Sequence, residues 1–204
     1  MEKARWTFPI LVLLSLCAWT SAAQPERKGS AVKNSSYEVA GERVLRHEVT
    51  INAALEQVWH SVTTTEGLRT WVAPVMEFEL RTGGKFHSNY RPGAQIGDPG
   101  TIYNTVLSYL PQKMLSFKIG LTDRFPEGPR EAGTLLAVVQ FEAMGKRKTK
   151  AILSVVGFGQ GSEWDTVYKF FDTNNPSSLS MLRESLEKGP IDWQKPKTPS
   201  KDAK

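Results

Sequence analysis

The strongest constraint on the fold is a series of short segments in which apolar and polar residues alternate. In residues 114–121, Leu115, Phe117 and Ile119 are separated by Ser116 and Lys118. Alternation with a period of two puts one apolar face on an extended strand. The same kind of pattern occurs, with turn residues between the segments, at residues 43–51, 75–81, 85–91, 101–109, 133–143 and 149–156. We therefore predict a largely antiparallel sheet, because short turns join antiparallel neighbours.

Two of these segments flank Gly83-Gly84, which is a strong signal for a β-hairpin. Apolar residues at helical spacing indicate two short helices after the first strand, in residues 52–62 and 65–72. Pro74 ends the second of them. The order of elements is thus one strand, two short helices, and then the remaining strands.

A long helix is predicted to close the domain, beginning near Ser162 and ending at Gly189-Pro190. Its first half has an apolar stripe of aromatic and branched residues, and leucines resume the stripe after residue 178. Asn174-Asn175-Pro176 interrupts this pattern, and we expect a kink or break there because proline removes a helical hydrogen bond. The fold class is α+β, with an antiparallel sheet and a long C-terminal helix.

The two ends of the chain differ in composition from this central domain. Residues 1–23 combine Lys3 and Arg5, an apolar run, and small residues at 21–23, the order typical of a secretory signal peptide. An uncleaved N-terminal anchor is the alternative. We expect a flexible linker at 24–41, a domain at 42–190 and a disordered tail at 191–204. The protein is therefore predicted to be exported, either to a periplasm or outside the cell, with no membrane span after cleavage.

Composition excludes several functional classes. The single cysteine, Cys17, lies in the predicted signal peptide, so the mature chain would have no disulfide and no thiol nucleophile. Most of the net charge of +5 comes from residues 1–23 and 191–204, and no basic stripe predicts nucleic-acid binding. Gly157, Gly159 and Gly161 precede the last helix, but their spacing is not that of a nucleotide-binding loop. We expect these glycines to let the chain bend, and we expect no cofactor.

Four short motifs carry a family resemblance. They are Asn52–Trp59 (NAALEQVW), Thr63–Trp71 (TTTEGLRTW), Gly83–Phe86 (GGKF), and Gly157–Tyr168 (GFGQGSEWDTVY). In this order they resemble the START-like (SRPBCC, birch-pollen-allergen-like) superfamily, in the branch related to the C-terminal domain of the activator of the heat-shock-protein-90 ATPase. The resemblance covers residues 42–190 and implies a helix-grip fold. In this fold a curved antiparallel sheet wraps around the last helix, and a cavity lies between the sheet and the helix. Members of the superfamily bind lipids, hormones or polyketides, catalyse cyclisation, or act on chaperones.

Aromatic residues on the strands and the last helix are the candidates for the wall of such a cavity. A ligand-binding wall of this kind combines apolar surface with a few polar groups. An ordinary filled core would explain the same aromatic residues. The candidates are Trp71, Phe86, Tyr90, Tyr103, Phe117, Phe141, Phe158, Trp164, Tyr168 and Phe171.

Ionisable residues give weaker signals. His47, His60 and His87 do not have the spacing of a metal site, although His87 could transfer protons if it faced the cavity. Glu77 and Glu79 share one face of a strand and are expected to face solvent. The leading hypothesis is an exported protein that binds a small hydrophobic or amphipathic molecule without catalysis. The alternatives are an enzyme of the cyclase or hydratase type and a protein-interaction module, and no protein partner can be named from the residues.

Overall fold

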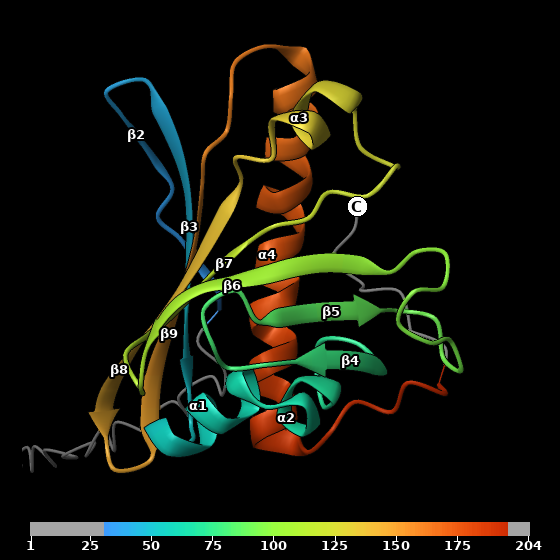
Figure 1. Ribbon diagram of the computed structural model, residues 1–204. Helices are drawn as coiled ribbons and strands as arrows, with labels where there is room; N and C mark the ends of the chain where they lie inside the picture. Colours follow the sequence, from blue (N-terminus) through green and yellow to red (C-terminus); the bar gives the residue numbers. More distant parts are fainter. Residues whose placement is uncertain (1–30, 196–204) are drawn as a thin grey trace, which may run out of the picture.

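The computed structural model describes residues 31–195 of the 204-residue chain (Figure 1). These residues form one open antiparallel sheet and four helices, the last of which is much the longest. In chain order the elements are β1 Lys33–Asn34, β2 Tyr37–Val39, β3 Glu42–Ile51, α1 Leu55–Thr63, α2 Thr65–Arg69, β4 Val75–Phe78, β5 Lys85–Asn89, β6 Ile102–Leu110, β7 Met114–Lys118, α3 Glu127–Ala132, β8 Leu136–Gly145, β9 Lys148–Val156 and α4 Ser162–Lys188.

The sheet follows the order β1-β3-β9-β8-β7-β6-β5-β4, and β2 also pairs with β3. Strands β4 to β9 form an unbroken series of antiparallel neighbours, as the alternating segments and turns predicted. The short helices α1 and α2 carry the chain from β3, near one edge of the sheet, to β4 at the other. This connection lets β3 pair with β9 instead of with β4.

Strand β3 shows how alternation places residues in the interior. Leu45, His47, Val49 and Ile51 share one face, and each is at most 2% exposed. That face contacts α4, around which the sheet curves (Figure 1). Three of these residues are apolar, so most of the face contributes to the hydrophobic core.

A kink or a break was expected at residues 174–176. Helix α4 runs without interruption from Ser162 to Lys188, so the break was wrong. Pro176 lies within the helix. A proline there removes the hydrogen bond to the carbonyl group four residues earlier, which belongs to Asp172. Buried contacts on both sides of the proline, at Val167, Leu179 and Leu182, hold the helix against the sheet.

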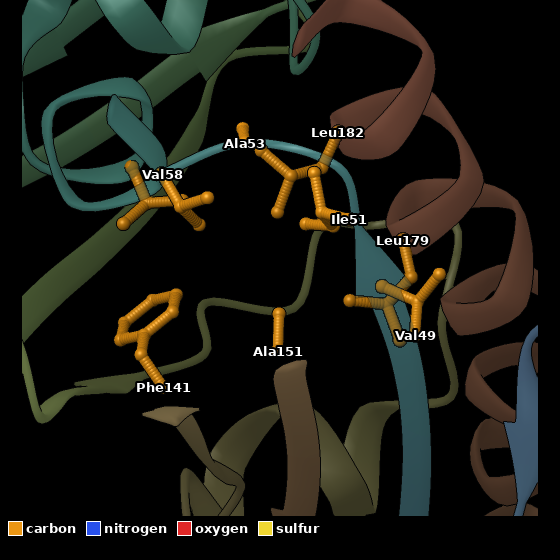
Figure 2. Close-up of a cluster of buried hydrophobic side chains, with 9 residues drawn as sticks. Val49, Ile51, Ala53, Val58, Phe141, Ala151, Leu179 and Leu182 are labelled. Atoms are coloured by element: carbon orange, nitrogen blue, oxygen red, sulfur yellow. The ribbon is translucent and has the colours of Figure 1, made fainter. Parts of the chain in front are cut away.

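The core forms clusters at different positions along α4. In one cluster, side chains of β3 and α1 pack against Phe141 and against Leu179 and Leu182 of α4 (Figure 2). A second cluster surrounds Val167 near the start of α4, and a third lies between α2, Phe86 and Leu115. Side chains from all three clusters also border an internal cavity.

The flanks differ from the prediction where the structure describes them. Within the expected linker, β1 and β2 pair with β3, and Asn34 Nδ2 donates a hydrogen bond to Asp172 Oδ1 at 3.1 Å. At the start of the expected tail, the Ile191 amide donates to the Thr70 carbonyl, and Trp193 Nε1 donates to the Arg69 carbonyl at 2.7 Å. Both segments make hydrogen bonds to residues that are distant in the sequence. The composition of a segment does not predict such long-range contacts.

The predicted signal peptide and the remainder of the expected linker and tail, residues 1–30 and 196–204, lie outside the described residues. Among residues 31–195, no helix has both the length and the apolar character that a membrane span requires.

Candidate ligand-binding cavity

A cavity of about 440 Å³ lies between the concave face of the sheet and α4. This volume is within the range of about 300–1,000 Å³ that is usual for small-molecule sites. The wall is mainly apolar and includes contributions from α1, α2, five strands, the segment after β7 and the middle of α4. Its apolar members include Val62, Leu68, Trp71, Phe86, Ile102, Leu115, Phe117, Ile119, Leu121, Phe125, Leu153, Phe170, Phe171, Leu179, Met181 and Leu182.

Half of the aromatic residues nominated from the sequence line this cavity: Trp71, Phe86, Tyr90, Phe117 and Phe171. Phe86 makes edge-to-face contacts with Phe78 and Phe117, at centroid distances of 5.2 and 4.7 Å. The Trp71 indole is oriented by a hydrogen bond from Nε1 to the Ser61 carbonyl at 3.0 Å. Such contacts fix the rings that form the wall.

Tyr103 does not line the cavity, and the reason is strand geometry. Successive side chains on a strand point to opposite faces, and the neighbours Ile102 and Asn104 face the cavity. Tyr103 therefore lies on the outer face, where it is 52% exposed and makes an edge contact with His87 at 4.9 Å. It borders a separate surface hollow formed with residues 97–101 and 120–123.

Four other nominated residues are core packing residues outside the cavity wall. Phe141 packs edge-to-face against Trp59 at 5.8 Å in the cluster of Figure 2. Phe158, Trp164 and Tyr168 belong to the cluster near the start of α4. The packed-core alternative thus describes these four residues, whereas the cavity alternative describes the five in the wall.

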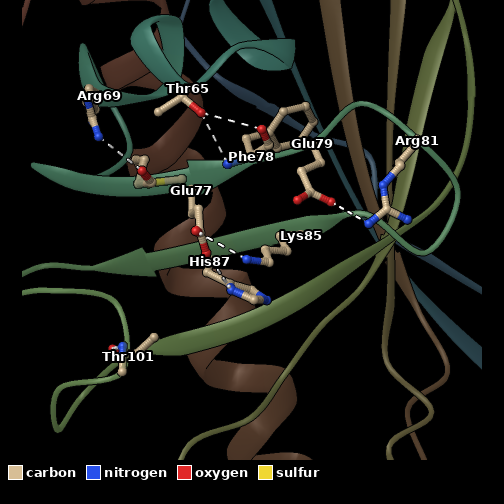
Figure 3. A network of polar contacts seen from close by, with 11 residues as sticks. Thr65, Arg69, Glu77, Phe78, Glu79, Arg81, Lys85, His87 and Thr101 are labelled. Carbon is tan, nitrogen blue, oxygen red and sulfur yellow. Dashed lines mark hydrogen bonds and ion pairs between the residues drawn. The ribbon is translucent and has the colours of Figure 1, made fainter.

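The ionisable residues of β4 and β5 lie on the outer face of the sheet (Figure 3). Glu77 lies 3.3 Å from Lys85 Nζ and 3.4 Å from His87 Nδ1, and Glu79 pairs with Arg81. Phe86 and Ser88, on either side of His87, line the cavity. His87 therefore points away from it, and the expectation that the two glutamates face solvent is confirmed.

The other two histidines are also outside the wall. His60 is exposed on α1. His47 is fully buried beneath α4, where its Nε2 lies 3.4 Å from Asp172 Oδ1 without forming a well-aligned hydrogen bond. Burial lowers the pKa of His47, and the nearby Asp172 carboxylate partly opposes this.

Apart from Tyr90, sequence reasoning missed the polar residues in the cavity wall. Arg124, in the segment between β7 and α3, and Asn175, on α4, both line it. Asn175 is 5% exposed, and its amide nitrogen has no hydrogen-bond partner among the described residues. A signal for Asn175 was present, because it continues the four-residue spacing from Phe171 to Leu179 with a polar side chain.

Tyr90 and Arg124 are the titratable side chains among the described residues of the wall. Burial of the hydroxyl group raises the pKa of Tyr90, and the positive charge of Arg124 opposes this shift in part. The phenol is therefore neutral near neutral pH and can donate a hydrogen bond. The wall as a whole can hold an apolar molecule and fix its polar atoms at a few points.

An open antiparallel sheet curved around a long C-terminal helix, with a cavity between them, defines the helix-grip class of proteins. The chain belongs to the Activator of Hsp90 ATPase homolog 1-like family, which it matches over residues 52–187, more than half of its length. This confirms the resemblance to the SRPBCC superfamily and to this branch of it. The family fold binds ligands or interacts with proteins.

Solved structures agree with this assignment at the level of the fold. The chain is similar to the Aha1 dimer from Colwellia psychrerythraea, with 17% identity, a TM-score of 0.56, and coverage of 72% of this chain and 97% of that one. It is also similar to protein MLL2253 from Mesorhizobium loti, with 18% identity, a TM-score of 0.57, and coverage of 73% of this chain and 100% of that one. A third similar structure is CalU16 from Micromonospora echinospora, with 14% identity, a TM-score of 0.55, and coverage of 80% of this chain and 88% of that one. The chain matches no curated protein.

Proposed function

We propose that the protein binds a small hydrophobic or amphipathic molecule in the cavity between the sheet and α4. The observation that carries this proposal is the cavity itself, whose volume of about 440 Å³ and mainly apolar wall suit a small organic ligand. A few polar side chains, among them Tyr90 and Asn175, interrupt that wall. This combination gives affinity through apolar burial and orientation through hydrogen bonds.

The cyclase or hydratase alternative has less support. General acid–base catalysis needs a group that exchanges a proton near the operating pH and lies within reach of the ligand. The described wall offers Tyr90 and Arg124, and the pKa of Tyr90 is raised. His87 and Glu77 lie on the outer face of the sheet. Binding without catalysis therefore remains the function that this site supports best.

The protein-interaction alternative rests on a different surface. Strand β6 exposes Tyr103, Leu107, Tyr109 and Leu110, which are each at least 36% exposed. Exposed apolar groups of this kind occur at docking surfaces. An interaction module has no need for an apolar cavity, however, and the cavity is what the ligand-binding proposal explains.

Filling the cavity tests the proposal. Ala137 on β8 is 1% exposed and lines the wall, so Ala137→Phe would occupy space that a ligand needs. We expect binding of the neutral apolar dye Nile red, measured by fluorescence, to weaken by more than about tenfold. Ala143→Phe is the matched control, because residue 143 is exposed near the end of the same strand.

Circular dichroism would establish that both variants are folded. Equal binding by Ala137→Phe and the unchanged protein would contradict the proposal. Native mass spectrometry of protein purified from its own source provides a second test, and a chain without any extractable ligand would count against it.

Export is also a proposal, and it is supported by the basic, apolar and small-residue order of residues 1–23. N-terminal sequencing of the protein recovered from its own source would test it. We expect the mature chain to begin close to residue 24. A cytosolic protein that still carries residues 1–23 would overturn this proposal without affecting the cavity.

A further inference from the structure

One part of the cavity wall brings together a cation and a phenol from two separate loops. Tyr90 follows β5, and Arg124 lies between β7 and α3, and both contribute to the wall. The positive charge of Arg124 favours the ionised form of the Tyr90 phenol. The wall therefore contains a cation and a phenolic donor that interact electrostatically.

Arg124 has no carboxylate partner within residues 31–195, since none of the ion pairs there includes it. Its guanidinium group instead lies over the rings of Phe125 and Phe170, at 5.0 and 4.8 Å from their centroids. Stacking of this kind leaves the N–H groups in the guanidinium plane available as donors. Asp123 precedes Arg124 in the chain but does not neutralise it through an ion pair.

Tyr90 supplies a second donor in the same wall. Its side chain is 51% exposed, yet burial around the hydroxyl group raises its pKa. Tyr90 therefore lies at the border of the wall, where it is partly open to solvent. Such a residue can be reached from outside and can still donate to a group inside the wall.

Asn175 is an independent observation that indicates a ligand oxygen. It lies one helical turn beyond Phe171, is 5% exposed, and has an amide nitrogen without a partner in the described protein. A buried donor without an acceptor is unfavourable and uncommon in folded proteins. An acceptor atom on a molecule in the cavity would satisfy this donor.

We propose that the ligand is a single-chain amphipathic anion, whose carboxylate or phosphate head group binds Arg124 and Tyr90 and whose apolar chain fills the cavity. This inference rests on the proposed function and specifies its ligand class. An anion pairs with the Arg124 guanidinium in charge-assisted hydrogen bonds, and the neutral Tyr90 hydroxyl group adds a donor. The apolar wall then accounts for the chain, and Asn175 provides a donor for a ligand oxygen.

Ligands with one chain and different head groups test this inference. The probes are decanoate, decyl phosphate, decanol and decyltrimethylammonium, and their dissociation constants with the full-length protein would be measured by calorimetry. We expect at least one of the two anions to bind about tenfold more tightly than decanol, since hydrogen bonds to charged groups contribute about 1.5–3 kcal/mol. The cation should bind most weakly, and the better anion identifies the head group.

Variants assign the effect to the named residues. Arg124→Gln should weaken anion binding much more than decanol binding and so remove the preference for the anion, whereas Arg124→Lys should keep part of the preference. Tyr90→Phe should weaken anion binding by less than Arg124→Gln does. Arg147→Gln is the matched control, because it removes the same charge at the turn between β8 and β9, outside the wall.

The outcomes separate this inference from the proposed function. If decanol and the anions bind equally well, or if Arg124→Gln retains the preference, the anionic ligand class is wrong and the cavity proposal stands. If none of the four probes binds, both proposals are wrong. Arg124 is exposed, so its replacement should leave the fold intact, as circular dichroism would check.

Discussion

His47 is the residue whose environment differs most from that expected of its side chain. It is fully exposed to solvent in an unfolded chain, whereas in the fold it is 0% exposed and both ring nitrogens lack a hydrogen-bond partner. The carboxylate of Asp172, on α4, lies close to it, with 3.4 Å between Nε2 and Oδ1. Burial nevertheless lowers the pKa of His47 below 6.5.

This lowered pKa predicts a loss of stability in acid. Below pH 6.5 the unfolded chain binds a proton at His47 that the folded protein does not bind, so the free energy of unfolding falls as the pH falls. As the pH falls below 6.5, we expect the free energy of unfolding, measured by urea unfolding, to decrease with a slope of at most about 1.4 kcal/mol per pH unit. His47→Leu should remove this slope, and His60→Gln, on the exposed face of α1, should retain it. An unchanged slope in His47→Leu would contradict the assignment.

The candidate site shows how far single residues can be placed from the sequence. Phe86 lies on the inner face of the sheet, as alternation predicts. Tyr103 was nominated only because it is aromatic. Its neighbours Ile102 and Asn104 face the cavity, so Tyr103 itself points outward. Phe141 is buried on β8, but at a point along the strand where α1 packs against the sheet. It therefore contacts α1 and does not line the cavity. Depth along a strand depends on which helix covers it, and periodicity contains no information on that. Arg124 belongs to no motif, so only the folded chain reveals its position in the wall.

At the scale of elements, the predicted order of β3 to β9 and the helices α1, α2 and α4 is confirmed. These elements have strong periodicity and clear turns between them. Helix α3 has no counterpart among the predicted helices, and its sequence EGPREA contains glycine and proline, which are poor helix formers. Strands β1 and β2 are short and exposed, and they exist through pairing with β3. Elements whose stability comes from distant partners are those that local patterns fail to predict.

Helix α4 provides a prediction at this scale because Pro176 lies in its interior. Proline in a helix costs about 3 kcal/mol relative to alanine, and the rigidity that it gives to the unfolded chain offsets up to about 1 kcal/mol of this. Pro176→Ala should therefore raise the free energy of unfolding by about 2 kcal/mol in urea. Lys169→Ala, at an exposed position of the same helix, should change it by less than about 0.5 kcal/mol. A destabilised Pro176→Ala would show that proline makes contacts that outweigh the missing bond.

At the scale of the whole molecule, the sheet and α4 enclose a space that their own side chains do not fill. The clusters on either side hold the helix in place through residues such as Val167 and Leu182. The segment after α4 adds a further attachment, because Ile191 and Trp193 bond to the carbonyl groups of Thr70 and Arg69. The cavity is thus framed by packed core at several points, and it can remain open without loss of the fold.

A ligand that binds this cavity should stabilise the entire domain. Binding to the folded state alone adds about 2.7 kcal/mol to the free energy of unfolding when the free ligand concentration is about 100 times its dissociation constant. With decanoate as the probe at that concentration, we expect this gain in urea unfolding of the unchanged protein and of Ala143→Phe. In Ala137→Phe, whose new side chain occupies the wall lined by Ala137, the gain should be absent. An equal gain in all three proteins would place decanoate on another surface, because only occupation of the cavity makes the stabilisation depend on residue 137.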